Sequence, residues 1–142
     1  MSASHGHILT SQSVGPHRIE LEVRDIVHIH YGGDVELTHF HGFNDVMTLF
    51  PPTTPLYLLR NARGGGVVAP ETRNYIATKL VQSRFIAIAT YGASFQSKTV
   101  FSNMNRATRI TRPESGIPVV FFDTEEEARD WLHEYRAALD PA

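Results

Sequence analysis

The hydrophobic pattern of this chain begins with strict alternation across residues 17–24, where every second position from Ile19 to Val23 is apolar and the positions between are charged. This period of two predicts a half-exposed strand. Residues 26–31 are more uniformly apolar and predict a second strand. The junction between the two is short, so we expect an antiparallel hairpin. Residues 1–16 predict a loose arm, with at most a short extended piece at 7–12.

Apolar residues then recur at spacings of three and four, which predicts an amphipathic helix that the Pro51-Pro52 pair must end. Asp34 is the predicted N-cap of this helix, because its carboxylate can accept hydrogen bonds from unpaired backbone amides. The apolar positions are Leu37, Phe40, Phe43, Met47 and Phe50.

Residues 125–139 predict the last helix, with a capping box formed by Thr124 and Glu127. The dipole at this helix start favours negative charge, which explains Glu125, Glu126 and Glu127 without a catalytic role. The predicted apolar stripe consists of Ala128, Trp131, Leu132, Tyr135 and Leu139.

The centre of the chain alternates strands and helices. Strands are predicted at 56–59, 85–90 and 117–122, helices from Pro70 and over 92–106, and a loop with three consecutive glycines over 61–69. The order ββαβαβαβα predicts an α/β fold with a mixed, mostly parallel sheet and helices on both faces. One domain over 17–140 is expected, with the strand at 17–24 at or near an edge of the sheet.

Composition limits the classes of function. The 142 residues carry a net charge of −2, which argues against a broad nucleic-acid-binding surface. There is no cysteine, hence no disulfide or thiolate site. No apolar run reaches the ~20 residues of a membrane span, and no secretory signal pattern is present. We expect a cytoplasmic protein that binds neither nucleic acid nor any cofactor.

Several short stretches carry a resemblance to a known family: residues 70–75, 86–89, 117–119 and 122–128, then Trp131-Leu132. They resemble STAS-like domains related to bacterial anti-sigma-factor antagonists, and most closely a small uncharacterised bacterial branch of them. The resemblance covers roughly 17–139. It implies a STAS-like fold and a non-enzymatic regulatory module that binds another protein, such as a regulatory kinase, a sigma-related protein or a STAS protein.

The chain departs from that group at one important place. The classical antagonists carry an Asp-Ser-Ser-Gly-like stretch whose serine is phosphorylated, whereas residues 60–66 and 70–72 here contain no serine. Thr72 is the nearest hydroxyl, so its phosphorylation is a weaker hypothesis. We expect the partner to dock on the glycine-rich loop and the helix start after it. The predicted docking residues are Arg60, Asn61, Arg63, Gly64, Glu71, Thr72 and Arg73. The strand at 17–24 offers a further route, to a homodimer.

Histidine is unusually frequent, with eight copies. On a strand, His28 and His30 point to one face, and Glu20 or Glu22 on the neighbouring strand can supply a third metal ligand. We favour the alternative in which both histidines are partly buried packing residues, and predict no metal site. His39 and His41 make a weaker pair, because positions two apart diverge on a helix.

Three further hypotheses rank below a docking module. The loop at Arg63–Gly66 resembles an anion cradle, but no nucleotide-binding motif is present, and a plain connector is the simpler interpretation. A small-molecule or lipid-binding domain is the main alternative function, with Phe40, Phe43 and Phe50 lining its pocket; these residues are more simply explained as core. A histidine-dependent metalloenzyme ranks last.

Overall fold

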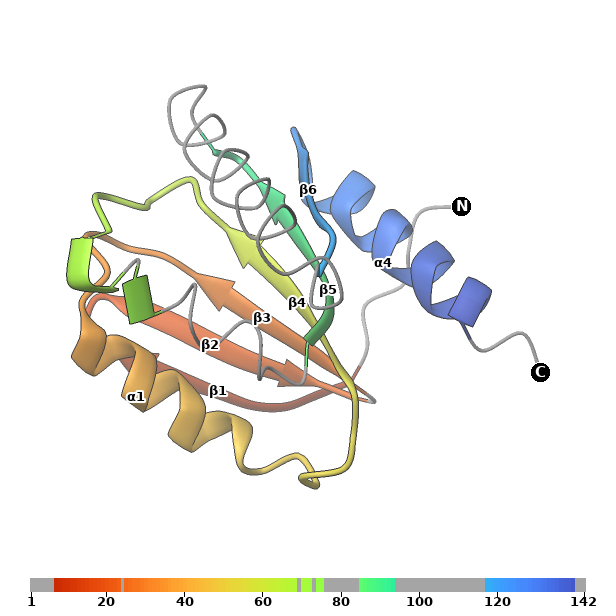
Figure 1. Ribbon diagram of the computed structural model, residues 1–142, viewed down its shortest axis with the longest axis horizontal. Coiled ribbons are helices and arrows are strands. Elements are labelled where there is room, and N and C mark those ends of the chain that lie inside the picture. Colours follow the sequence, from red (N-terminus) through yellow and green to blue (C-terminus); the bar gives the residue numbers. More distant parts are fainter. Residues whose placement is uncertain are drawn as a thin grey trace.

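A computed structural model of the protein describes residues 7–23, 25–68, 70–72, 74–75, 85–93 and 117–139. Its centre is one sheet of six strands, which lie side by side in chain order (Figure 1). The strands are β1 (Ile8–Val14), β2 (His17–Glu22), β3 (Ile26–His30), β4 (Leu56–Asn61), β5 (Phe85–Tyr91) and β6 (Val119–Phe122), and the helices are α1 (Leu37–Met47) and α4 (Glu125–Leu139).

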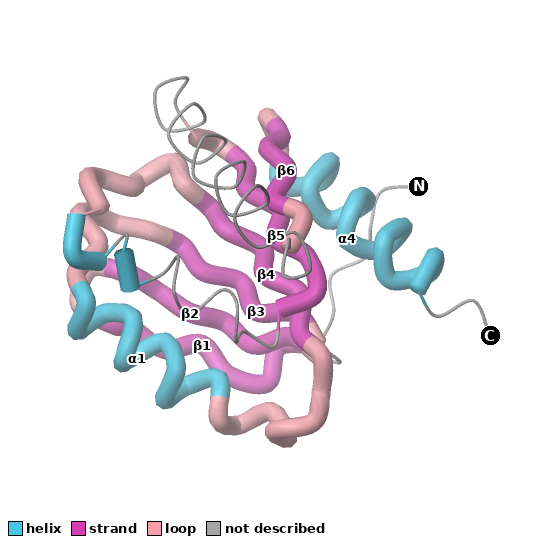
Figure 2. Tube along the Cα trace, viewed as in Figure 1, coloured by secondary structure: helices cyan, strands magenta, loops and turns pink. Residues whose placement is uncertain are grey.

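The sheet is mixed, as predicted. β1, β2 and β3 pair antiparallel, whereas β3 to β6 are all parallel to their neighbours. The predicted hairpin is confirmed, with Ile19 of β2 opposite Ile29 of β3. Figure 2 shows the six strands as one twisted layer. The carboxyl ends of the four parallel strands therefore lie along one edge of this layer.

The start of the sheet differs from the prediction. Residues 8–14, expected to belong to a loose arm, form β1, which pairs along the full length of β2. β2 is therefore an internal strand next to β1, which agrees with the predicted position near an edge. The exposed edge on which the expected homodimer route depends belongs to β1 instead. The β1–β2 turn is Gly15-Pro16, and Gly15 has a φ of 59° that a side chain would strain. The expected extended piece at 7–12 overlaps this strand. The polar run at 10–13 and the mostly exposed side chains show no alternating pattern that would have predicted the whole strand.

The two faces of the sheet bury separate apolar clusters. Side chains alternate between the faces along each strand. On one face Phe43 and Val46 of α1 pack with residues such as Ile19 and Leu58. On the other, Ala128 and Leu132 of α4 pack with residues such as Leu59. The predicted helices on both faces are thus confirmed.

Strand order decides how far each face is covered. Right-handed crossovers between parallel strands in sequential order keep the crossing segments on one face, where α1 lies. α4 follows the last strand, and its body packs on β4, β5 and β6 at the far end of the other face (Figure 1). The α4 face of β1 and β2 consequently carries polar side chains, among them the exposed Ser11 and Arg18.

The loop after β4 packs closely on the segment that follows β3. Val35 N–H donates to Val67 O and Gly66 N–H to Gly33 O. The prediction that Asp34 is the N-cap of α1 is wrong, because Glu36 occupies that position. The Asp34 carboxylate instead accepts a hydrogen bond from the Val67 N–H at 2.7 Å. The glycine-rich loop is therefore a fixed structure and not the plain connector that its composition indicates.

The last helix matches its prediction closely. Thr124 and Glu127 form the expected capping box, with Glu127 N–H donating to Thr124 Oγ1 at 3.2 Å and Thr124 N–H to Glu127 Oε1 at 3.3 Å. Ala128 and Leu132 are buried, but Leu139 is 57% exposed and lies outside the apolar stripe. A charged residue, Arg129, is buried on the same side of the helix.

The two predicted middle helices lie mostly outside the described residues. Residues 70–72 and 74–75 are helical, which agrees with a helix start at Pro70. The rest of that predicted helix and nearly all of the predicted helix at 92–106 are not among the described residues. Among the described helices, none is both long and apolar enough to cross a membrane.

One prediction concerns the packing of the glycine loop. A Cβ on Gly64 would lie 2.6 Å from Tyr31 O, a backbone atom that cannot move aside, so Gly64→Ala should lower the free energy of unfolding by about 1–3 kcal/mol. Gly33→Ala is the matched control, because its Cβ would meet only the Pro16 side chain, at the ordinary contact distances of 3.6 and 3.8 Å. Urea denaturation of both variants measures the difference, and equal stability would show that the loop is not held at Tyr31.

A second prediction concerns the ion pair between α4 and β2. Arg129 Nη1 and Nη2 each donate to the Glu22 carboxylate at 2.8 Å, and both residues are almost fully buried. Arg129→Met should destabilise the protein by about 3–5 kcal/mol, because it leaves a buried carboxylate unpaired. The double variant Glu22→Leu, Arg129→Met should recover most of this loss in urea denaturation. Arg18→Met, at an exposed site on β2, is the control. If Arg129→Met loses no more stability than Arg18→Met, the pairing of Arg129 with Glu22 is contradicted.

Candidate functional site

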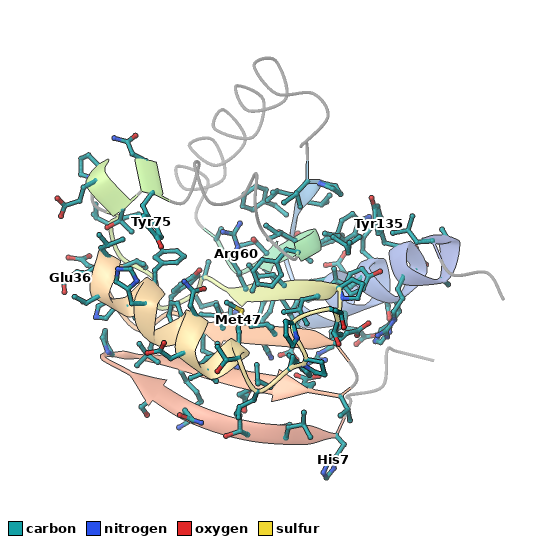
Figure 3. The ribbon with its side chains drawn as sticks, turned by 60° about the horizontal axis from the view of Figure 1, so that its bottom comes forward. His7, Glu36, Met47, Arg60, Tyr75 and Tyr135 are labelled. Atoms are coloured by element: carbon teal, nitrogen blue, oxygen red, sulfur yellow. The ribbon has the colours of Figure 1, made fainter. Side chains whose placement is uncertain are left out.

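The predicted docking residues divide into exposed and buried groups. Arg63, Gly64 and Glu71 are exposed, Asn61 is half-buried, Arg60 and Thr72 are buried, and Arg73 lies outside the described residues. Figure 3 places Arg60 inside the molecule, where its Nε donates to Thr90 Oγ1 at 2.9 Å. Arg60 therefore supports the sheet from within and has no access to a partner.

Thr72 is also inaccessible. It is 0% exposed, and its Oγ1 is buried with no hydrogen-bond partner among the described residues. A kinase cannot reach this hydroxyl in the conformation seen here. The structure thus gives no support to the hypothesis that Thr72 replaces the phosphorylated serine of the classical antagonists.

The exposed part of this surface is the loop of residues 62–68, which we call the β4 loop. Arg63 N–H donates to Asn61 Oδ1 at 3.1 Å, and the Arg63 guanidinium lies 5.6 Å from the centre of the Tyr91 ring. Val67 is 70% exposed at the far end of the loop. The β4 loop therefore presents one cation and one apolar side chain to solvent.

A second polar region lies on the α4 face of the sheet, centred on Arg129. In addition to its two bonds with Glu22, Arg129 donates from Nε to Glu125 Oε2 at 2.7 Å. Burial by itself would raise the pKa of Glu22, but hydrogen bonds and charge from Arg129 and His28 outweigh it and lower the pKa to about 2. The Arg129 pKa is raised by the same carboxylates against the effect of burial. Both groups are charged across the physiological range.

His28 lies next to this ion pair and extends the network. Its Nδ1 is 3.3 Å from Arg129 Nη2 and its Nε2 is 2.7 Å from Tyr91 Oη. Tyr91 in turn donates to Glu125 Oε1 at 3.3 Å. Since Arg129 can only donate, His28 Nδ1 accepts and the ring proton lies on Nε2. The four side chains then form a closed ring in which every donor has an acceptor.

Burial sets the protonation of the two uncharged members. It lowers the pKa of His28, an effect strengthened by the nearby His30 and Arg129 charges and partly opposed by Glu22. Burial also raises the pKa of Tyr91, as does the neighbouring Glu125 carboxylate. Both side chains are consequently neutral near pH 7.

The outer side of the network is partly open to solvent. His30 Nε2 is 2.9 Å from Glu20 Oε1, and His30 Nδ1 is 3.0 Å from Asn61 Nδ2. The Glu20 side chain is 17% exposed and that of His30 31%, whereas His28 is buried. Asn61 therefore contacts both this outer side and the β4 loop.

The structure brings the predicted histidine pair together as expected. His28 and His30 lie on one face with their ring centres 4.0 Å apart. Glu20 is the third member, with donor atoms of all three within 4.8 Å of one another. Glu22, the other candidate, is engaged by Arg129. Sequence reasoning missed Arg129 and Tyr91; the only available signal was a charged residue on the apolar side of the last helix.

A second histidine cluster lies on the opposite face. The buried His17 ring has Nε2 at 3.1 Å from both Asp34 O and His39 Nδ1, and its Nδ1 accepts the Gly32 N–H. His41 points elsewhere, with its ring 5.7 Å from that of Tyr75, which lies beside α1 (Figure 3). The predicted divergence of His39 and His41 is confirmed. These contacts join the turn after β3 to α1 and need no ligand.

No family model matches the sequence, and no curated protein matches it. The structure is similar to the crystal structure of an uncharacterized protein of the DUF3478 family, with a SpoIIAA-like fold, from Shewanella loihica PV-4. The TM-score is 0.55 and the sequences are 19% identical, with 93% of this chain and 98% of the other covered. At that identity the likeness is evidence of fold alone. The predicted STAS-like fold is confirmed: this chain has the SpoIIAA-like fold over nearly its whole length.

Proposed function

We propose that this protein is a non-enzymatic interaction module that docks a partner protein on the β4 loop and the helix start after it. The observation that carries the proposal is Val67, a large apolar side chain that is 70% exposed on a loop held by backbone hydrogen bonds. An apolar side chain held at a fixed, exposed position can enter an apolar pocket of a partner. The SpoIIAA-like fold adds a fold-level analogy to proteins that act by docking.

The fixed shape of the loop favours binding. Ordering a mobile side chain or loop at an interface costs about 0.5–1.5 kcal/mol per immobilised side chain. In the β4 loop the backbone is already held by hydrogen bonds. Gly65 N–H donates to Ala62 O, Ala62 N–H donates to Tyr91 O, and further bonds join the loop to the segment after β3. Most of the ordering cost is therefore met on folding, before any partner arrives.

The chemistry of the loop describes its partner. Val67 requires an apolar pocket, and the exposed Arg63 guanidinium favours a carboxylate or phosphate beside that pocket. Glu71, exposed at the helix start, adds a negative charge that sets orientation more than affinity. A regulatory kinase, a sigma-related protein or another STAS protein is the class of partner that the fold analogy suggests.

The polar network supports binding over catalysis. General acid–base catalysis works best with a group whose pKa lies near the working pH. Burial moves the pKa of His28 down and that of Tyr91 up, away from neutrality, and the Glu22 and Arg129 charges neutralise each other. These groups are arranged to stabilise the attachment of α4.

The lipid-binding alternative loses its main argument. Phe43 and Phe50 are 1% and 3% exposed, and Phe40 packs against the same apolar cluster between α1 and the sheet. Their burial is accounted for by the core of the domain.

The test compares two exposed apolar residues at opposite edges of the sheet. α1 runs from the carboxyl ends of the parallel strands back to their amino ends (Figure 1). Leu49, 60% exposed, follows the end of α1, whereas Val67 is in the loop at the carboxyl end of β4, so the two residues lie at opposite ends of the parallel strands. Val67→Asp should weaken binding of the captured partner at least about tenfold, or ~1.4 kcal/mol. Leu49→Asp is the matched control and should leave binding unchanged. The partner is first captured from the native host with wild-type bait, and its affinity is then measured by calorimetry.

Arg63→Glu provides a second measurement on the same surface. Reversing this charge should slow association and reduce its dependence on salt. The proposal is contradicted if Leu49→Asp abolishes binding of the partner. It is also contradicted if Val67→Asp and Arg63→Glu both bind with full affinity, since the interface would then lie outside the β4 loop.

A further inference from the structure

We propose that Glu20, His28 and His30 form a binding site for a divalent transition metal, best fitted by Zn²⁺, on the partly open α4 face of β2 and β3. One donor atom from each residue lies within 4.8 Å of the donor atoms of the other two. Glu20 Oε1 approaches both His28 Nδ1 and His30 Nε2, and we take these three atoms as the ligands. Two imidazoles and a carboxylate are a donor set that zinc takes in proteins, and one that Mg²⁺ and Ca²⁺ do not favour. This inference is independent of the docking proposal.

The spacing of the donors suits a tetrahedral ion. Zinc–ligand bonds of about 2.1 Å place neighbouring tetrahedral donors about 3.4 Å apart. Glu20 Oε1 lies 3.7 Å from His28 Nδ1 and 2.9 Å from His30 Nε2, on either side of that value. Side-chain movements of a few tenths of an ångström bring the donors to this spacing, and His30 binds through Nε2 with its ring proton on Nδ1.

The sheet itself holds the three residues in place. Glu20 and His28 are direct cross-strand partners in the β2–β3 register, and His30 follows two positions along the same face. All three lie on internal strands, so no loop has to be ordered when an ion binds. Sites carried by strands hold their geometry better than sites on loops.

The charge around the cluster favours a dication. The carboxylates of Glu20, Glu22 and Glu125 outnumber the single Arg129 guanidinium, which leaves an excess of two negative charges beside the two imidazoles. Arg18, opposite His30 in the register, is exposed, so solvent and salt screen its charge.

The hydrogen bonds of His28 already present the correct nitrogen. With its proton on Nε2 and directed at Tyr91, the ring offers the Nδ1 lone pair to the cluster. A second hydrogen bond that fixes tautomer and orientation is the usual support of a metal-binding histidine. Arg129 Nη2, 3.3 Å from Nδ1, gives up this long contact when an ion binds but keeps its bond to Glu22.

The outer side of the site leaves room for exchange with solvent. Glu20 and His30 are partly exposed, and Ser11, the cross-strand neighbour of Glu20 on β1, is a small exposed residue. Three protein donors leave the fourth tetrahedral position to water or to an anionic group, the pattern of an open zinc site.

The test titrates apo protein with ZnCl₂ by calorimetry. His5 and His7 form a separate His-x-His pair near the N-terminus, so every measurement uses a His5→Ala, His7→Ala background. We expect one zinc per chain, at least about 100-fold weaker binding with Glu20→Gln or His30→Gln, and about 10-fold weaker binding with Tyr91→Phe. His41→Gln, at an exposed histidine on α1, is the matched control and should bind zinc normally.

Circular dichroism and thermal melts make the result decisive. Zinc should raise the melting temperature of the background protein and leave that of the His30→Gln variant unchanged. Glu20→Gln keeps the size and shape of the side chain and decides the matter if His30→Gln fails to fold. Absence of zinc binding in the background protein, or binding that Glu20→Gln and His30→Gln leave intact, overturns the proposal.

Discussion

The arrangement of the α4 face depends on one buried ion pair, between Glu22 of β2 and Arg129 of α4. Two charges taken out of water are costly unless each is paired and fully hydrogen-bonded. Here the guanidinium fork meets the Glu22 carboxylate with two bonds of 2.8 Å and reaches Glu125 with a third donor. The pair fixes the angle at which the last helix crosses the sheet. It also gives His28 its orientation, and through His28 that of Tyr91.

Strand order explains why this polar region has an open side. α4, which follows the last strand, packs on β4 to β6. Toward β2 the helix contributes the long Arg129 side chain. The α4 face beyond β3 therefore carries Glu20 and Arg18 in place of an apolar cluster. The same topology places the β4 loop at the carboxyl ends of the parallel strands, where ligands bind in many open α/β sheets.

Much of this fold can be predicted from the sequence because hydrophobic period reports burial on one face or on both. The alternation at Ile19 and Leu21 predicted one strand, and the small residues Ala87 and Ala89 predicted a central strand. All four residues are buried in the observed strands β2 and β5. β1 was predicted only in part, as an extended piece at 7–12, because its polar residues at 10–13 show no apolar period. Without a full strand there, the expected edge fell at or near β2.

The candidate site was predictable to a similar extent. Residues two positions apart on a strand point to the same face, so the sequence alone predicted that His28 and His30 lie side by side. Register then selects Glu20, because it lies directly opposite His28, and Arg129 occupies Glu22. That second choice depends on a contact between residues 107 positions apart, which no local pattern contains. The burial of Arg60, on β4, and of Thr72, at the helix start, was hidden for the same reason, since it depends on packing against residues far away in the sequence.

Asn61 connects the two proposed sites. Its Nδ2 lies 3.0 Å from His30 Nδ1 and its Oδ1 accepts the Arg63 N–H, so one side-chain amide holds both the histidine ring and the base of the β4 loop. An ion on His30 Nε2 requires the ring proton on Nδ1, and Asn61 then has to turn its oxygen toward the ring. The Arg63 N–H loses its acceptor in that state. Metal occupancy and the conformation of Arg63 are thus linked, and by thermodynamic reciprocity a partner that holds Arg63 in its present position would weaken metal binding by the same factor.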